Sequence, residues 1–137
     1  MRRLLAGTLI AGAVAVALAV ARRVDAVAVR GRSMAPALLP GDRLLVARRR
    51  GTPKVGDVVV VADPRDGGRE LVKRVASVNA DRVTLLGDNA PASTDARAFG
   101  TVPATAVGWR AVLRYWPPSR LGPVPSSITT GSDRASQ

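Results

Sequence analysis

The chain contains neither histidine nor cysteine, and this restricts the chemistry that its side chains can perform. The lack of histidine excludes Ser-His-Asp and Cys-His catalysis and most zinc sites. The lack of cysteine excludes disulfides and thiol chemistry. A hydrolase built from this sequence must therefore use carboxylates, an oxygen-bound metal or a lysine that acts as a base.

Lysine is scarce in this strongly basic chain. The net charge is +11, and of the 21 lysines and arginines only Lys54 and Lys73 are lysines. We interpret most arginines as solvated surface charge, although a basic balance also favours acidic partners such as nucleic acid or anionic lipid. Aromatic residues make up only 3% of the chain, which argues against a stacking platform for nucleic acid. A lysine retained in this background is a candidate for a role that needs a removable proton, because arginine stays charged.

Lys73 lies in the most informative strand-like stretch, ELVKRV. Side chains two residues apart share one face of a strand, so Lys73 sits between Leu71 and Val75 in an apolar row. Glu70 and Arg74 point to the opposite face. Burial in such a row lowers the pKa of a lysine, and the neutral amine can then act as a general base. An edge lysine whose amine reaches water is the alternative that this stretch leaves open.

A lysine base needs a nucleophile, and Ser33 is the best placed serine. Ser119 and those after it fall in the tail, which leaves Ser33, Ser77 and Ser93. Ser33 follows the first strand-like stretch within GRSMAP, where the glycine allows close approach of a substrate and the proline ends the strand. Such a junction can expose a hydroxyl beside backbone amides that stabilise an oxyanion. A turn serine that bonds its own backbone is the alternative.

Residues 86–97, LGDNAPASTDAR, form a third polar element that is a candidate for an ordered loop. Asp95 and Arg97 could hold the loop by an ion pair, and Ser93 could hydrogen-bond a neighbouring amine. A calcium loop would need more carboxylates and a glutamate at its far end. We therefore expect no metal here, and no cofactor elsewhere.

A stretch without charge, residues 4–21, precedes these elements. As a helix it would be roughly 27 Å long, just enough to cross a bilayer core. A cleavable signal peptide is the rival, since Ala17-Leu18-Ala19 resembles a cleavage site. We expect a retained anchor. Charge alone leaves its orientation undecided, because arginines flank it on both sides, at positions 2, 3, 22, 23, 30 and 32.

Beyond the anchor the pattern is that of an all-β fold. Short apolar or alternating stretches are separated by turn signals such as PGD, DGG and GDN. The expected strands are Val24–Arg30, Arg43–Ala47, Val58–Val61, Glu70–Asn79, Arg82–Leu86 and Ala106–Trp116. We predict a barrel-like antiparallel β domain over residues 24–116. It would follow an anchor at 1–23 and precede a disordered tail, rich in Pro, Ser and Gly, at 117–137.

The candidate residues belong to a series of motifs between residues 27 and 103. In chain order these are Gly31-Arg32-Ser33-Met34-x-Pro36, Pro40-Gly41-Asp42, Gly56-Asp57-Val58-Val59, Val72-Lys73-Arg74 and Gly87-Asp88-Asn89-(x3)-Ser93-x-Asp95-x-Arg97-x-x-Gly100-x-Val102-Pro103. In order, spacing and residue type they resemble the successive boxes of type I signal peptidases (peptidase family S26). Any one box is weak, but five in sequence are specific. The anchor fits the small, single-span bacterial type.

The resemblance implies a role for each candidate. Ser33 would be the acylating nucleophile, and Lys73 the base that takes its proton. Ser93 would orient the amine, while Asp95 and Arg97 brace the loop. The family has a largely antiparallel β domain and cleaves after small residues, typically in Ala-x-Ala. The resemblance thus implies a serine endopeptidase that removes signal peptides through an acyl-enzyme.

The remaining boxes supply supporting residues. Asp88 and Asn89 belong to the last box, and Met34 would sit on an apolar surface near the membrane. Gly31 stands where some members have an oxyanion-hole serine, so the hole would rely on backbone amide, chiefly that of Ser33. The chain departs from the family pattern at two further positions: Ala37 stands where threonine is common, and Ala96 stands where serine is usual. These departures leave the substrate specificity less defined than the catalytic mechanism.

Several readings compete with general secretory processing. One relative of the family is the maturation protease of nickel-containing superoxide dismutase, which acts in the cytoplasm. A second reading is an inactive, membrane-tethered β module that binds anionic lipid or polymer through Arg48-Arg49-Arg50 and Lys54. A self-cleaving repressor of the LexA type would carry a DNA-binding domain where this chain has its anchor. We expect preprotein signal peptides and membrane lipid as partners, but no nucleic acid. The catalytic domain is expected on the extracytoplasmic face of the cell membrane.

Overall fold

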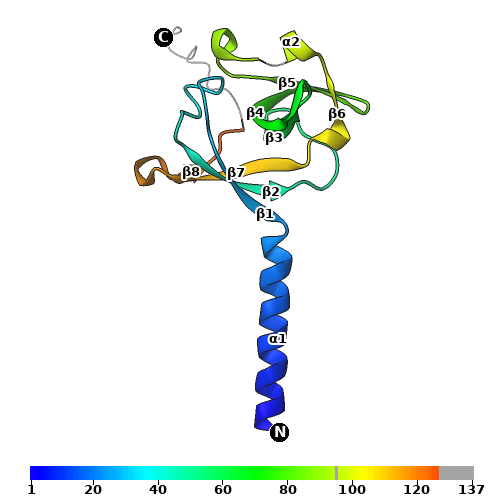
Figure 1. The fold of residues 1–137 in the computed structure, drawn as a ribbon, viewed down its shortest axis with the longest axis vertical. Helices are drawn as coiled ribbons and strands as arrows, with labels where there is room; N and C mark the ends of the chain where they lie inside the picture. Colours follow the sequence, from blue (N-terminus) through cyan, green and yellow to red (C-terminus); the bar gives the residue numbers. More distant parts are fainter. Residues whose placement is uncertain (95, 127–137) are drawn as a thin grey trace, which may run out of the picture.

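A long helix stands apart from a folded β domain in the computed structural model, which describes residues 1–94 and 96–126, except for the side chain of Arg2. Helix α1 (Arg2–Ala21) extends away from the domain without packing against it (Figure 1). Its segment Arg3–Ala21 has a mean hydropathy of 2.4 and is not buried in the protein. By length and composition, this helix could cross a membrane.

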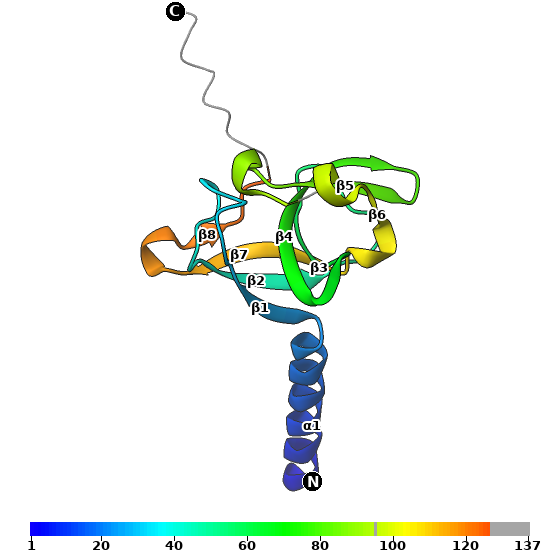
Figure 2. The same ribbon diagram turned by 45° about the horizontal axis from the view of Figure 1, so that its top comes forward.

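The domain is built on one antiparallel sheet, as the turn signals and strand patterns predicted. Its strand order is β1-β2-β7-β3-β4-β5-β6, with β8 added beside β7. Figures 1 and 2 show that β1, β2 and β7 run across the end nearest α1, whereas β5 and β6 lie farther away. The strands are β1 (Val24–Ala28), β2 (Arg43–Arg48), β3 (Val58–Asp63), β4 (Asp66–Asn79), β5 (Arg82–Leu86), β6 (Val102–Pro103), β7 (Trp109–Trp116) and β8 (Gly122–Pro123).

Short helical elements complete the chain. Three single turns of 3-10 helix are η1 (Ala90–Ala92), η2 (Ala104–Ala106) and η3 (Pro118–Arg120), and α2 (Ala96–Phe99) is one turn of α-helix. The expected last strand, Ala106–Trp116, therefore begins later, because residues 104–106 form η2. The expected first strand is also shorter and ends at Ala28, before the loop that carries Ser33.

The sheet curls so that β3 is buried on both faces. Val58 and Val60 join a core with Leu44 and Val46, whereas Val59 and Val61 join a second core. Alternate side chains of one strand point to opposite faces, so a strand between two cores reads as the continuous VVVV run seen in the sequence. The second core also contains Leu71, Val75, Val83, Leu85, Val102 and Val107.

The expectation of a disordered tail from residue 117 is wrong for residues 117–126. Strand β8 pairs with β7, and Val124 packs against the first core. Arg120 donates hydrogen bonds of 2.9 and 3.0 Å to the buried carboxylate of Asp42, more than 70 residues away. The Pro- and Ser-rich composition of this segment indicated disorder, whereas its order comes from contacts with residues far away in the sequence. Residues 127–137 lie outside the described residues.

Candidate active site

Lys73 lies at the centre of β4 with its side chain buried, only 2% exposed. Leu71 and Val75, its neighbours on the same face, are 6% and 1% exposed, and Val59 of β3 is its partner across the sheet. Lys73 Nζ donates a hydrogen bond of 2.9 Å to Ser93 Oγ. The prediction of a lysine within an apolar row is confirmed, and the alternative in which its amine reaches water is wrong.

Ser33 lies in the loop that follows β1 and is partly exposed. Gly31, two residues earlier, has a φ of +76°, which a residue with a side chain rarely adopts. Asn89 holds this loop from the other side of the site. Its backbone N–H donates to the Ser33 carbonyl oxygen at 2.8 Å, and its Nδ2 donates to the Arg32 carbonyl oxygen at 3.0 Å.

Gly87 marks the place where the segments that carry Ser33 and Ser93 approach each other. A Cβ atom at this buried position would clash with Ser93 Oγ and lie 2.7 Å from the Ser33 carbonyl oxygen. The absence of a side chain at Gly87 therefore lets the loop that carries Ser33 lie close to Ser93, the hydrogen-bond partner of Lys73. Within the described residues, the Ser33 hydroxyl makes no hydrogen bond. Catalytic hydrogen bonds are often longer or absent before substrate binds.

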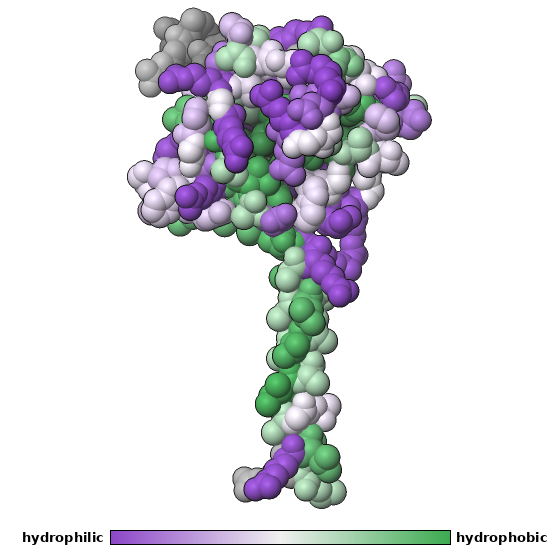
Figure 3. Space-filling view, in the orientation of Figure 1, coloured by the Kyte–Doolittle hydropathy of each residue, from purple (hydrophilic) through white to green (hydrophobic). Residues whose placement is uncertain are grey.

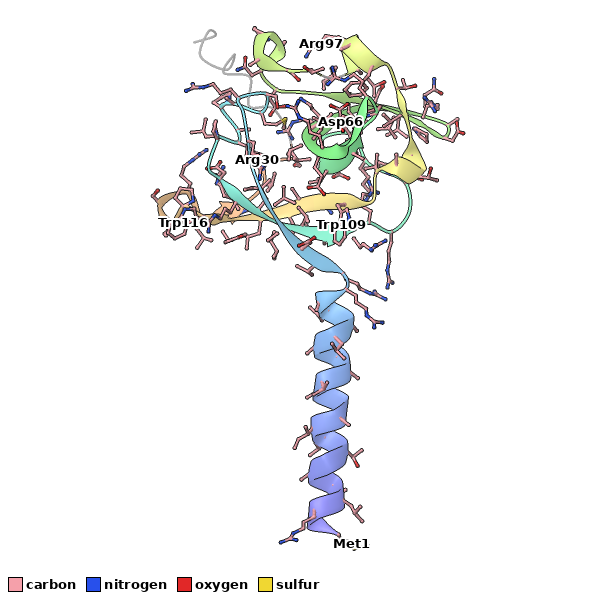
Figure 4. All side chains as sticks on the ribbon, viewed as in Figure 1. Met1, Arg30, Asp66, Arg97, Trp109 and Trp116 are labelled. Atoms are coloured by element: carbon pink, nitrogen blue, oxygen red, sulfur yellow. The ribbon has the colours of Figure 1, made fainter. Side chains whose placement is uncertain are left out.

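Ser33 and Lys73 line the same cleft, which has a volume of about 850 Å³. One wall is formed by residues 26–34 and the other by residues 67–73 of β4, with Ala92 and Thr94 at one end. Figure 3 shows apolar surface in a hollow on this side of the domain, between hydrophilic residues. Figure 4 labels Arg30, which lines one wall, and Asp66, the first residue of β4, which directly precedes the other wall.

Both walls of the cleft offer strand edges. In the described part of the chain, β1 pairs with β2 alone, and residues 66–73 of β4 pair only with β3. Each segment therefore presents unpaired backbone N–H and C=O groups along its other edge. An extended peptide could form backbone hydrogen bonds with either edge while its side chains enter the cleft.

Arg74, the neighbour of Lys73, fixes the loop that carries the last box. Its guanidinium donates to both carboxylate oxygens of Asp88, each at 2.8 Å, and the two side chains are 6% and 2% exposed. It also donates to the carbonyl oxygens of Gly56 and Pro125, both at 2.8 Å. Strand alternation placed Arg74 away from Lys73, but did not show that its face was also buried. The one feature of the sequence that could have indicated this burial is that Arg74 directly follows Lys73 within the same motif.

Three other expected site residues need comment. Met34 is 1% exposed and packs in the first core with Leu38 and Leu44, so the expectation that it sits on an apolar surface near the membrane is wrong. It anchors the loop beside Ser33 from within. Asp95 lies outside the described residues. Arg97, in α2, is exposed and interacts with neighbouring groups, and its bracing role stays a prediction.

One strong electrostatic perturbation lies at the β3–β4 hairpin. The Arg65 side chain and then the Arg65 backbone N–H donate to Asp63, and these hydrogen bonds lower the pKa of the Asp63 carboxyl from 3.8 to about 2. The same pairing raises the pKa of Arg65. This ion pair stabilises the turn that leads into the β4 wall of the cleft. No cluster of three or more carboxylates that could hold a metal occurs in the described residues.

Comparison with known proteins shows the family to which the chain belongs. The family model described as "Signal peptidase, peptidase S26" matches residues 1–85 and 76–116. The mitochondrial ATP-independent inner membrane protease subunit 1a of Arabidopsis thaliana is 38% identical over 120 residues, which cover 69% of this chain and 71% of that protein.

Two further relatives show the range of the likeness. The mitochondrial inner membrane protease subunit 1 of Xenopus tropicalis is 30% identical over 120 residues, 71% of this chain and 72% of that protein. Signal peptidase I of Leptolyngbya laminosa is 47% identical over 45 residues, 33% of this chain and 22% of that protein. The likeness thus extends to mitochondrial proteases as well as to a signal peptidase I. The chain belongs to the signal peptidase family, peptidase S26.

Proposed function

We propose that this protein is a membrane-anchored serine endopeptidase that removes signal peptides with a Ser33/Lys73 dyad. The observation that carries the proposal is the buried Lys73 amine, bonded to Ser93 in the same cleft that Ser33 lines. Burial among Leu71, Val75 and Val59 disfavours a charged ammonium and so supports a neutral amine. A buried base beside a serine meets the general requirement for an activated nucleophile.

The proposed reaction has two steps. Ser33 Oγ attacks the carbonyl carbon of the scissile peptide bond, and its proton passes to Lys73 Nζ. That proton then goes to the leaving amine as the C–N bond breaks, which leaves an ester on Ser33. A water molecule, deprotonated by the same amine, hydrolyses the ester. The backbone N–H of Ser33 is the candidate donor to the oxyanion, and Ser93 orients the amine through its 2.9 Å contact.

The unpaired strand edges support an extended peptide as the substrate. A signal peptide that lies between residues 26–34 and 67–73 would present alternate side chains to the cleft floor. The family resemblance adds a preference for small residues, in the Ala-x-Ala pattern. Dedicated maturation of one precursor, as for nickel-containing superoxide dismutase, would use the same residues and differ only in substrate.

Ser33→Ala in the full-length protein, assayed in detergent with an Ala-x-Ala precursor, tests this proposal. The variant should lose cleavage while its unfolding temperature stays within a few degrees of wild type, because only one hydroxyl is removed from a partly exposed loop. Ser77→Ala and Ser119→Ala, both at exposed positions, are the matched controls and should keep near-full activity. Comparable cleavage by Ser33→Ala would overturn the dyad. An inactive wild type would favour the tethered lipid-binding module instead.

The location is part of the proposal. We infer that α1 is a retained single span and that the domain lies on the extracytoplasmic face of the cell membrane, where signal peptides emerge. The exposed apolar surface of α1 supports the span. Protease protection of sealed membrane vesicles tests the side, and resistance to carbonate extraction with an intact N-terminus tests the anchor. A mature chain that starts near Val20 or Arg22 would instead show a cleaved signal.

A further inference from the structure

A second cavity lies away from the catalytic cleft and is lined mostly by cations. Its volume is about 220 Å³, and Arg48, Arg49, Arg50, Lys54 and Arg110 line it together with one carboxylate, that of Asp57. We call this cavity the basic pocket. It shares no lining residue with the cleft that contains Ser33 and Lys73. Its residues come from β2, from the loop that follows β2, and from β7.

Arg49 gives the basic pocket the character of a binding site. Its side chain is only 7% exposed, and its Nη2 donates to the carbonyl oxygens of Gly51 and Thr52. Its Nε and Nη1, however, have no hydrogen-bond acceptor in the described residues. Proteins rarely leave a buried charged donor unpaired. Two unpaired donors on one buried guanidinium, beside a cavity, indicate that an acceptor from outside the chain belongs there.

The one carboxylate of the pocket does not fill that role. Asp57 Oδ2 lies 3.5 Å from Arg49 Nη1 without hydrogen-bond geometry, and it accepts the backbone N–H of Lys54 at 3.2 Å. Its Oδ1 lies 3.5 Å from Nε of Arg110. Asp57 is thus shared among several donors, and the cations around it outnumber it. A pocket of this sign and size suits a group with several anionic oxygens, and guanidinium groups match phosphate in geometry.

The position of the basic pocket near the end of α1 indicates that the phosphate belongs to a lipid headgroup. The backbone N–H of Arg48 donates to the carbonyl oxygen of Arg23 at 2.8 Å, and Val24 pairs with Ala47. Arg23 follows the end of α1 by only two residues, so the pocket opens where the helix would leave the hydrocarbon core. Figure 3 shows hydrophilic residues gathered beside this end of α1. Headgroup phosphates occupy a layer roughly 5–7 Å thick at that depth.

An aromatic residue beside the basic pocket also indicates that the pocket lies at the level of the lipid headgroups. The Arg48 guanidinium lies 5.1 Å from the centroid of the Trp109 ring, and Figure 4 labels Trp109 at the end of the domain nearest α1. Tryptophan is enriched at membrane–water interfaces. Basic residues there gain from the negative potential of anionic lipid. We propose that the basic pocket binds the phosphate of an anionic phospholipid headgroup and so orients the domain on the membrane. This inference does not depend on the proposed peptidase activity.

Native mass spectrometry of the full-length protein, released from neutral detergent micelles, tests the proposal. Phosphatidylglycerol should bind as one retained lipid, and more tightly than phosphatidylcholine, whose choline cation the pocket repels. Arg49→Gln should weaken phosphatidylglycerol binding by about tenfold or more, as for a lost charge-assisted hydrogen bond. Arg110→Gln, at a side chain that is 52% exposed, should weaken it in the same direction. Arg82→Gln, which removes an exposed arginine bonded to Thr101 outside the pocket, is the matched control.

A second arm separates lipid from free phosphate. Inorganic phosphate is titrated into the lipid-free protein, with Trp109 emission followed in a Trp116→Phe background. Weaker phosphate binding that phosphatidylglycerol displaces, or none at all, supports the lipid source. Saturation by phosphate without retained lipid overturns it. The proposal is also overturned if wild type, Arg49→Gln and Arg110→Gln bind phosphatidylglycerol with equal affinity. It is overturned as well if the pocket binds neither lipid nor phosphate and holds only water. If Arg49→Gln fails to fold, Arg110→Gln decides.

Discussion

Asp88→Asn is expected to destabilise the domain severely, although the proposed reaction has no step that uses Asp88. The substitution keeps the shape of the side chain but removes the charge that faces Arg74 through two bonds of 2.8 Å. Both side chains are almost fully buried, so solvent cannot replace the lost partner. Leaving one member of a buried pair without its counterion costs about 3–5 kcal/mol. That is a large part of the ~5–15 kcal/mol that holds a typical domain folded.

Thermal unfolding of the full-length protein in detergent, followed by circular dichroism, measures this cost. For a domain of this size the loss corresponds to a fall in the unfolding temperature of at least about 12 °C. Asp81→Asn, at an exposed carboxylate in the β4–β5 turn, is the matched control and should change it little. Adding Arg74→Gln to Asp88→Asn should cost less than the sum of the two single changes, because the unpaired cation is removed. If Asp88→Asn unfolds at the temperature of Asp81→Asn, the assignment of this pair as a structural clamp is refuted.

Two further predictions concern the walls of the cleft. Gly87→Ala should lower the rate of cleavage by about 100-fold, because its Cβ displaces Ser93 or the Ser33 loop. Gly108→Ala is the matched control and should keep the wild-type rate, because the space around its Cβ position is open. Equal rates for the two variants would refute the close approach at Gly87. Asp63 has a lowered pKa in the folded state, so its ion pair with Arg65 stabilises the fold above pH 3.8, and this contribution is lost as pH falls toward about 2. In acid titrations followed by circular dichroism, Asp63→Asn should therefore be less stable than wild type near neutral pH and approach it toward pH 2; a constant difference would contradict the assignment.

Much of the fold could be predicted from the sequence, because patterns among neighbouring residues determine where the strands form. Residues 82–86 form the expected strand without change, and the continuous run at 58–61 is the strand between two cores. The row Leu71, Lys73 and Val75 could be placed on one face because β-strand alternation depends only on neighbours in sequence. The sequence alone left open whether the Lys73 side chain is buried or reaches water, and in the structure it is buried.

Two features that the sequence did not predict, the burial of Arg74 and the order of residues 117–126, depend on contacts between segments far apart in the chain. The sequence placed Arg74 on the face opposite to Lys73 but did not predict its burial, because nothing local shows that Pro125, 51 residues later, accepts a hydrogen bond from it. The segment at 117–126 read as disordered for the same reason, since Arg120 meets Asp42 only in the fold. Met34 is a different case, because its surface position was implied by the family resemblance, whereas the structure buries it in the first core with Leu38 and Leu44.

Lys73→Met gives the most direct test of the account. Methionine has a similar length and suits the apolar surroundings of Leu71, Val75 and Val59, so the variant should fold, with an unfolding temperature close to that of wild type. It has no amine, and no other buried lysine is present among the described residues. Single-turnover cleavage of an Ala-x-Ala precursor should therefore fall by at least about 1,000-fold. A folded Lys73→Met protein that cleaves the precursor at a rate comparable to wild type would contradict the Ser33/Lys73 mechanism.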